Sequence, residues 1–363
     1  MTRTLAYKPN AAEVLERLRM LYGGEARDRI LAAIEVPSRA LARFQEQYSH
    51  GYCSYPDLQE RLRFWDDYLS ERSGVEDDSL PAAYLSEFDQ GLYGGLFGGD
   101  VQFMAHPDNG WISSMVAPLL DDWSEFEDLH FDPSHPWYRR FLNQTRAFVE
   151  AGNGKFGVSH FILIDGLNFV FELVGATRTY LSLEERPEMV RRAIDLAFEV
   201  NARIQADFFE IVPLLDGGTL SNMAQWLPGR IVSESVDPFH MTSVDYFEQW
   251  GREPVERILG RFDGGVLHIH GNGRHLLEAV SSVRGLKAIF LGDDTGYPRP
   301  FEVLGELQSR TGEMPLVVEV QFEEFQRGLE ERTLCGGVLY RVETAPDVDA
   351  ANRCMEQVRA YRL

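Results

Sequence analysis

The chain has 363 residues, of which 57 are acidic and 35 are lysine or arginine, so its formal net charge is −22 at neutral pH. This charge argues against nucleic acid and against an anionic membrane surface as partners, because both repel an acidic protein. Charged residues make up 25% and hydrophobic residues 44% of the sequence, which excludes a disordered chain and predicts a compact fold.

The cysteine content and the start of the sequence bear on the compartment. Three cysteines, Cys53, Cys335 and Cys354, are too few for a disulfide framework. No apolar segment of the signal-peptide kind begins the sequence, and its most apolar stretch, residues 161–174, is too short to span a membrane. We therefore expect reduced thiols, no membrane association and a cytoplasmic location.

The first third of the chain predicts helices and turns. Apolar residues recur three or four positions apart from residue 10 to about residue 73, as on one face of an amphipathic helix. Turn-forming residues are frequent over residues 77–133 and leave one plausible strand, residues 101–105. We expect residues 1–100 to form a helical extension and an entry segment.

The remaining sequence alternates between short β-branched or aromatic runs and amphipathic segments of helix length, as parallel βα units do. With residues 101–105 there are eight predicted strands, the others being 155–161, 208–213, 230–233, 265–270, 288–291, 316–321 and 333–340. The predicted helices are 187–205, 242–259, 273–283, 299–311 and 348–361. Eight such units are typical of a TIM barrel, so we predict an α/β fold with a closed (β/α)₈ barrel over residues 101–363. An open doubly wound sheet is the alternative, but no Gly-x-Gly-x-x-Gly motif follows the first strand.

The sharpest motif is His268-Ile269-His270, followed by Gly271 and Gly273. Side chains alternate along a strand, so the two histidines point the same way, roughly 6.6 to 7 Å apart at Cα. The glycines end the strand in a turn, which puts both imidazoles at the carboxyl end of a parallel strand, where barrel enzymes have their active sites. The pair indicates a metal site or, alternatively, two histidines that make ordinary hydrogen bonds in a polar barrel mouth.

Cys335 is a candidate third ligand. It falls on the last predicted strand, before two glycines that would let a metal or a ligand approach the backbone. With His268 and His270 it would form an open zinc site that leaves one coordination position for substrate or water. The alternative is a buried thiol with no chemical role.

Further candidates follow the ends of other predicted strands. Acidic groups near a metal supply a ligand or orient an imidazole, so Asp237 and Glu319 are catalytic candidates. Gln321, Trp226 and Tyr297 are candidates for binding substrate, although aromatic residues in such positions are at least as often part of the core. Asp293, Asp294 and His240 also lie near strand ends, where a solvated loop position is the alternative.

A series of short segments completes the sequence evidence. In order they are Asp122-Trp123, Phe131-Asp132-Pro133, Pro136-Trp137-Tyr138, Glu172-Leu173-Val174-Gly175, Arg186-Pro187-Glu188-Met189-Val190, Asp237 with Met241-Thr242-Ser243, Phe247-Glu248-Gln249-Trp250, His268-Ile269-His270-Gly271 and Cys335-Gly336-Gly337-Val338. Taken together, from residue 101 to the C-terminus, the series resembles the uroporphyrinogen decarboxylase superfamily, and most closely its branch of zinc-dependent, corrinoid-linked methyltransferases.

The resemblance implies a (β/α)₈ barrel, Zn²⁺ as cofactor, a thiol or related small molecule as methyl acceptor, and a methylated corrinoid on a separate protein, or a small methylated molecule, as donor. His268 and Cys335 match ligand positions of that branch, whereas His270 stands where a cysteine is usual. An imidazole there leaves the site more electrophilic than a thiolate would. A metal-free decarboxylase of the same superfamily, with Asp237 holding the substrate, and a catalytically silent binding barrel are the alternatives. The decarboxylase branch carries an Arg-Gln-Ala-Gly-Arg-Tyr segment, which this sequence lacks.

Overall fold

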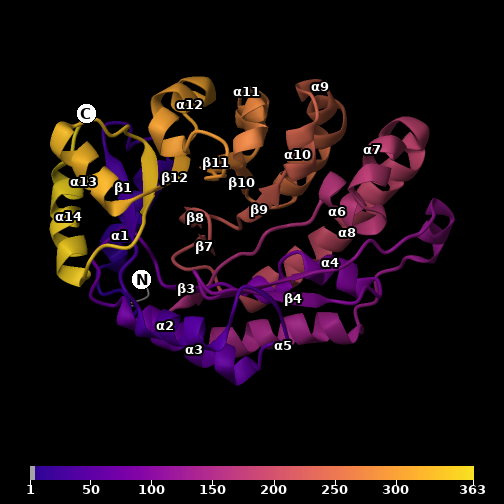
Figure 1. Ribbon diagram of the computed structural model, residues 1–363, viewed down its shortest axis with the longest axis horizontal. Coiled ribbons are helices and arrows are strands. Elements are labelled where there is room, and N and C mark those ends of the chain that lie inside the picture. Colours follow the sequence, from indigo (N-terminus) through magenta and orange to yellow (C-terminus); the bar gives the residue numbers. More distant parts are fainter. Residues whose placement is uncertain (1–4) are drawn as a thin grey trace.

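A computed structural model describes residues 5–363, and its centre is a six-stranded sheet in which all neighbouring strands are parallel (Figure 1). The strands, in spatial order, are β1 (Ile30–Ile34), β13 (Val338–Val342), β12 (Leu316–Val320), β11 (Leu286–Leu291), β10 (Gly265–Ile269) and β9 (Val232–Ser235). β1 is buried at every position, and β11, β12 and β13 are largely buried, which is why these segments read as apolar runs.

Helices connect the strands and cover the outer face of the sheet, as Figure 1 shows for α11 to α14. From β9 onward every strand is followed by helical structure, namely α9 (Val244–Tyr246), a π-helical turn (Phe247–Gly251) and α10 (Arg252–Arg261), then α11 (Leu277–Ser281), α12 (Leu304–Thr311), α13 (Phe322–Glu331) and α14 (Val348–Ala360). The sequence-based expectation of an α/β fold with a central parallel sheet is therefore confirmed.

Only sparse contacts extend past the two edges of this sheet. β3 (Ala82–Ala83) pairs in parallel with β6 (Gly157–Val158), and an isolated bridge joins Ile162 to Ser233 of β9. On the other side, the Asp78 backbone N–H donates to the Ala32 carbonyl of β1 at 2.8 Å. Among residues 5–363 the named strands do not form one continuous closed ladder.

Other strands lie outside the central sheet. The predicted strand 101–105 corresponds to β4 (Gln102–His106), which pairs antiparallel with β2 (Gly51–Cys53) and β5 (Trp111–Met115). It is not a barrel strand, because the tight turn at residues 107–110 returns the chain as a hairpin, and parallel strands require a long crossover. β7 (Gly218–Ser221) and β8 (Gln225–Pro228) form a second hairpin.

Two of the predicted elements are wrong. The run Ile30–Ile34, read as helical, is strand β1, so the first hundred residues contribute a strand to the sheet and do not form a purely helical extension. Residues 208–213, read as a strand, contain the end of α8 (Pro187–Ile211), where Ile204 and Phe208 lie one helical turn apart in the core. The remaining helices are α1 (Ala11–Tyr22), α2 (Arg39–Gln47), α3 (Leu58–Glu71), α4 (Gly91–Leu96), α5 (Pro136–Ala151), α6 (Gly166–Val174) and α7 (Ala176–Glu185).

The amino end of the strands is sealed by apolar packing. Leu15 and Leu18 of α1 belong to the same buried cluster as Leu31, Val266 and Leu339, which alternate with outward-facing residues on their strands. The β7–β8 hairpin packs into this cluster as well. Small molecules must therefore approach the interior from the carboxyl ends of the strands.

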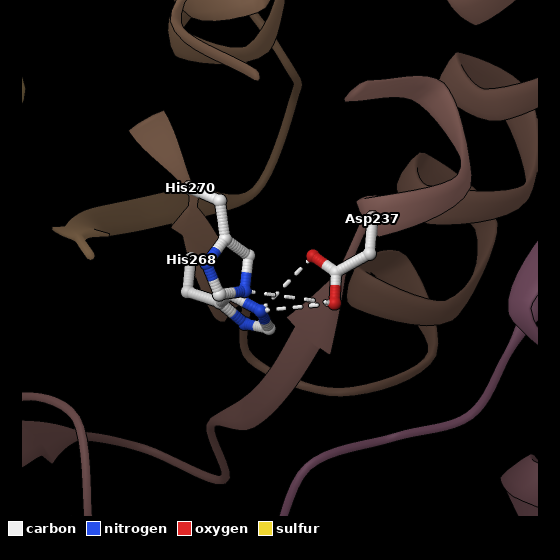
Figure 2. A group of neighbouring side chains, drawn as sticks. All are labelled: Asp237, His268 and His270. Atoms are coloured by element: carbon white, nitrogen blue, oxygen red, sulfur yellow. Dashed lines mark hydrogen bonds and ion pairs between the residues drawn. The ribbon is translucent and has the colours of Figure 1, made fainter. Parts of the chain in front are cut away.

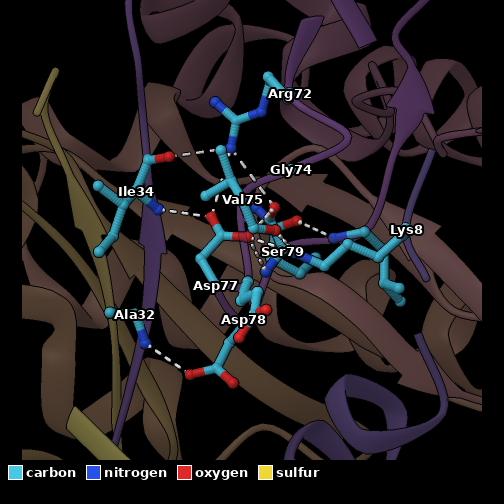
Figure 3. A network of polar contacts seen from close by, with 12 residues as sticks. Lys8, Ala32, Ile34, Arg72, Gly74, Val75, Asp77, Asp78 and Ser79 are labelled. Atoms are coloured by element: carbon cyan, nitrogen blue, oxygen red, sulfur yellow. Dashed lines mark hydrogen bonds and ion pairs between the residues drawn. The ribbon is translucent and has the colours of Figure 1, made fainter. Parts of the chain in front are cut away.

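Two buried carboxylates hold the free edge of β1 (Figure 3). Asp77 Oδ2 accepts from the Ile34 backbone N–H at 2.7 Å, and Asp78 Oδ2 accepts from Ala32 N–H at 2.9 Å. Lys8 Nζ donates to the other oxygen of Asp77 at 2.6 Å, and both side chains are buried. Burial opposes ionisation of Asp77, but Lys8 and Arg72 hold its pKa below the usual value, so the carboxylate stays charged.

Replacing Asp77 by Asn should destabilise the fold strongly. The variant leaves Lys8 as an uncompensated buried charge, which costs about 3–5 kcal/mol. Chemical denaturation followed by circular dichroism measures the loss. Asp28→Asn, at a carboxylate whose side chain is 59% exposed, is the matched control and should change the unfolding free energy by less than about 0.5 kcal/mol. Equal effects of the two substitutions would contradict this account.

His160 provides the link between β6 and β9 that the short strands do not. Its Nδ1 accepts from the Ser233 backbone N–H at 3.1 Å, and its Nε2 lies 2.6 Å from Gln205 Oε1. The ring is fully buried, and burial lowers its pKa to about 4. The neutral form, with the proton on Nε2, satisfies both contacts at once.

Stability should therefore fall on acidification through His160. The folded-state pKa of about 4 lies below the unfolded value of about 6.5, so the unfolded chain binds the extra proton in this window. The unfolding free energy of the native protein, measured relative to that of His160→Gln, should decrease by up to about 1.4 kcal/mol per pH unit from pH 6.5 to pH 4. A difference between the two proteins that does not change with pH would refute the assignment.

Candidate metal centre

The candidate site lies at the carboxyl ends of β9 and β10. His268 is the fourth residue of β10, and His270 directly follows the strand. Asp237 begins a 3-10 turn, Asp237–Met241, two residues after β9 ends. As the alternation of side chains predicts, the two imidazoles meet on one side of the strand, with ring centroids 5.0 Å apart and an interplanar angle of 83°.

The three side chains converge on a common point (Figure 2). His268 Nε2 lies 3.0 Å from Asp237 Oδ1 and 3.3 Å from Oδ2, and His270 Nε2 lies 3.8 Å from Asp237 Oδ2. One donor atom from each residue lies within 4.8 Å of the other two, and among residues 5–363 no other set of three cysteines, histidines or acids does so. Two imidazole nitrogens and one carboxylate oxygen suit zinc or another divalent transition metal.

Electrostatics keep the carboxylate ionised. Burial opposes the charge on Asp237, but His268, together with His240 and His270, holds the pKa of the carboxyl well below its ordinary range. Burial likewise disfavours the imidazolium of His268, and Asp237 overcomes this and raises the His268 pKa. Asp237 is thus a permanent anion at neutral pH and can act as a ligand.

A second carboxylate orients His270. Asp294 Oδ1 lies 2.9 Å from His270 Nδ1, and Asp294 Oδ2 accepts from the Gly271 backbone N–H at 2.5 Å. A proton held on Nδ1 by Asp294 leaves the Nε2 lone pair directed at Asp237, as a metal ligand requires. Asp294, a loop residue of no certain role in the sequence, therefore supports the site.

His240 completes the histidine cluster. It lies 3.7 Å from Asp237 Oδ1, and its ring centroid is 5.6 Å from that of His270. Burial lowers its pKa to about 4, so it is neutral. A Cβ atom on Gly273 would lie 2.1 Å from His240 Cδ2, and only glycine leaves room for this ring.

The structure separates Cys335 from the histidines, so this predicted ligand is wrong. Strand β13 begins at Val338, and Cys335 therefore lies ahead of the strand, at the amino end of the sheet. It lines a surface cavity with Arg27 and Leu363, and burial raises the pKa of its thiol. The residue that lies near the two imidazoles, where the sequence predicted Cys335, is Asp237.

The remaining predicted residues lie at different places. Glu319 faces Arg341, its register partner on β13, at 3.5 Å, and Gln321 is exposed at the start of α13. The structure contradicts substrate binding by Trp226, because its ring is fully buried and its Nε1 donates to the Leu215 carbonyl. Tyr297 is 47% exposed and covers Gly271, next to His270, so substrate contact remains a prediction for it.

Sequence reasoning missed Asp89, which lies close enough to His268 for each to shift the pKa of the other. Burial raises the pKa of Asp89 to about 6, and the Tyr84 hydroxyl donates to its Oδ2 at 2.7 Å. Asp89 stands among turn-forming residues without strand periodicity, so no pattern in the sequence pointed to it.

Comparison with solved structures identifies proteins of similar fold. The chain resembles a solved methyltransferase from Methanosarcina mazei, with a TM-score of 0.61 and 13% sequence identity over 98% of this chain and 99% of that one. At this identity the likeness shows a shared fold. No protein-family model and no curated protein sequence matches the chain. No helix within residues 5–363 is both long and apolar enough to cross a membrane.

Removing the Asp294 side chain should weaken metal binding selectively. Asp294→Ala frees the His270 ring to rotate, and loss of such an outer carboxylate lowers metal affinity by about 10–100-fold. Competition with a chromogenic chelator measures the affinity for Zn²⁺. Asp293→Ala removes the adjacent acid, which has no bond to His270, and should bind zinc as the native protein does. Equal zinc affinity in both variants would contradict the orienting role.

Proposed function

We propose that the protein is a zinc-dependent methyltransferase whose metal ion is held by Asp237, His268 and His270. The observation that carries the proposal is the convergence of these three donor atoms at the carboxyl ends of β9 and β10, with Asp294 behind His270. The methyltransferase of similar fold supports the reaction class. We further propose a (β/α)₈ barrel of the uroporphyrinogen decarboxylase superfamily that works in the cytoplasm.

The proposed reaction moves a methyl group to a thiol or a related acceptor from a methylated corrinoid on a separate protein, or from a small methylated donor. A zinc ion at this site would lower the pKa of an acceptor thiol, so that the nucleophilic thiolate exists near neutral pH. Asp237 contributes a fixed negative charge, and Asp294 fixes the direction of the His270 lone pair. The buried, neutral His240 packs against both Asp237 and His270.

Access to the site follows from the fold. α1 and the β7–β8 hairpin fill the amino end of the interior, so acceptor and donor both reach the histidines from the carboxyl ends of the strands. Tyr297, exposed beside His270, lies where an incoming acceptor passes.

Metal analysis of purified variants tests the ligand assignment. The native protein and Cys335→Ser should each contain close to one equivalent of zinc, since Cys335 is at the other end of the sheet, whereas His268→Ala should contain almost none. Plasma emission spectrometry measures the metal, and circular dichroism checks that the fold is retained. Full zinc occupancy in His268→Ala, or its loss in Cys335→Ser, would overturn the ligand set.

Activity provides the second half of the test. With free methylcobalamin as donor and a panel of small thiols as acceptors, the native protein should show methyl transfer and His268→Ala should show none. A folded, zinc-loaded protein that methylates no thiol would count against the proposed reaction. A metal-free native protein would favour the lyase alternative instead.

A further inference from the structure

A cavity of about 260 Å³ is lined by none of the three donor residues of the candidate metal centre. Its walls come from the segment after β1, from α3, from the β4–β5 turn and from the β7–β8 hairpin. Arg341 of β13 completes it. The cavity therefore lies on the β1 and β13 side of the interior, whereas the histidines lie on the β9 and β10 side.

The charged lining differs in sign from the chain as a whole. Lys8, Arg72 and Arg341 line the cavity together with two acids, Glu35 and Asp108, in a protein of net charge −22. The first two cations are committed to the fold: Lys8 Nζ donates to Asp77 and to a backbone carbonyl, and Arg72 donates to the Ile34 carbonyl and pairs with Glu35 (Figure 3).

Arg341 is the cation that remains available. Its guanidinium forms no hydrogen bond to any residue in the described part of the chain, approaches Glu319 to 3.5 Å, and lies 5.2 Å above the Phe290 ring. The side chain is 27% exposed. A guanidinium presents a planar fork of N–H donors that matches a carboxylate in two parallel hydrogen bonds.

Two neutral side chains of the same cavity also lack partners. Asn222 Oδ1 and Trp65 Nε1 are buried and form no hydrogen bond, although a buried polar atom without a partner is costly. Asn222 Oδ1 can only accept a hydrogen bond and needs a donor, whereas Trp65 Nε1 can only donate one and needs an acceptor. A hydroxyl group can satisfy either of them.

We propose that this cavity binds a small hydroxylated carboxylate, whose carboxylate lies on the Arg341 fork and whose hydroxyl groups meet Asn222 and Trp65. Arg341 connects this cavity to the metal centre through one residue, because it lies over Phe290 and Phe290 is the register partner of His268. The inference goes beyond the proposed function, since binding here requires neither a metal ion nor methyl transfer.

Binding of gluconate to the native protein is the first test. Gluconate carries one carboxylate and several hydroxyl groups, sorbitol has the hydroxyl groups alone, and inorganic phosphate is a tetrahedral anion. Because Trp65 and Trp111 line the cavity, intrinsic fluorescence reports occupancy, and calorimetry gives the dissociation constant. We expect gluconate to bind at millimolar concentration and the other two probes to bind at least about tenfold more weakly. Absence of gluconate binding, or equal binding of sorbitol or phosphate, would overturn the proposal.

Two substitutions with opposite expected effects make the test specific. Arg341→Gln should weaken gluconate binding at least about tenfold, and Glu319→Gln should strengthen it, because Glu319 competes for the guanidinium. If the Arg341–Glu319 pair has a merely structural role, both variants should bind gluconate more weakly, or neither should change its binding. Arg63→Gln, at an exposed position outside the cavity, is the control and should bind as the native protein does.

His268→Ala separates this inference from the proposed function. The variant should bind gluconate as the native protein does, because His268 is outside the cavity lining. If gluconate binds but the native protein never contains zinc, the proposed function is wrong and the cavity assignment stands. If the native protein contains stoichiometric zinc but does not bind gluconate, the cavity assignment is wrong and the proposed function stands.

Discussion

The parallel register between β9 and β10 determines the candidate metal centre. It places Ser235 opposite His268, and two residues beyond Ser235 the chain enters the turn whose first residue, Asp237, lies 3.0 Å from His268 Nε2. Both strands run in the same direction, so all of these side chains emerge at one end of the sheet. A shift of one residue in this pairing would turn the donor atoms toward opposite faces. The site therefore depends on the apolar residues that hold the two strands in place, such as Val232 and Val266.

Side chains hold both edges of the central sheet, where backbone pairing is sparse. β3 and β6 contain two residues each and offer few ladder hydrogen bonds. Asp77 and Asp78 bond the edge of β1, and His160 bonds the edge of β9. Lys8 and Arg72 hold the pKa of Asp77 below its usual value, and burial lowers the pKa of His160 to about 4, so Asp77 is charged and His160 is neutral at neutral pH. Acidification therefore weakens the edge of β9 as His160 becomes protonated.

The parts of the fold that the sequence predicted well are those with a single dominant pattern. β10, β11 and β12 are short apolar runs between amphipathic helices, and the predicted strands overlap all three. The His-x-His spacing gave two metal-ligand candidates because strand alternation is a local property. β1 was missed because its five residues are buried on both faces and show no alternation, so they resemble part of a helix.

The sequence named both Cys335 and Asp237 as candidates but could not show that Asp237 is the third donor, because the choice depends on a strand boundary and on a register between distant segments. The predicted last strand began at residue 333, and β13 begins at Val338. This difference of five residues moves Cys335 out of the strand to the amino end of the sheet. Asp237 reaches the histidines only through the pairing of β9 with β10, which no local pattern in the sequence records. Arg341 was missed for a similar reason: its significance is the lack of hydrogen bonds to its guanidinium, which is a property of the assembled interior.

The apolar packing that seals the amino end of the strands has a kinetic consequence. Because α1 and the β7–β8 hairpin fill that side, reactants reach the histidines from the carboxyl ends of the strands. In the proposed reaction, an acceptor would therefore have to be in place before a donor protein covers the carboxyl ends, and the product would leave only after that donor has withdrawn. The proposed methyl transfer would then follow a compulsory order of addition and release, in which excess donor inhibits by binding before the acceptor.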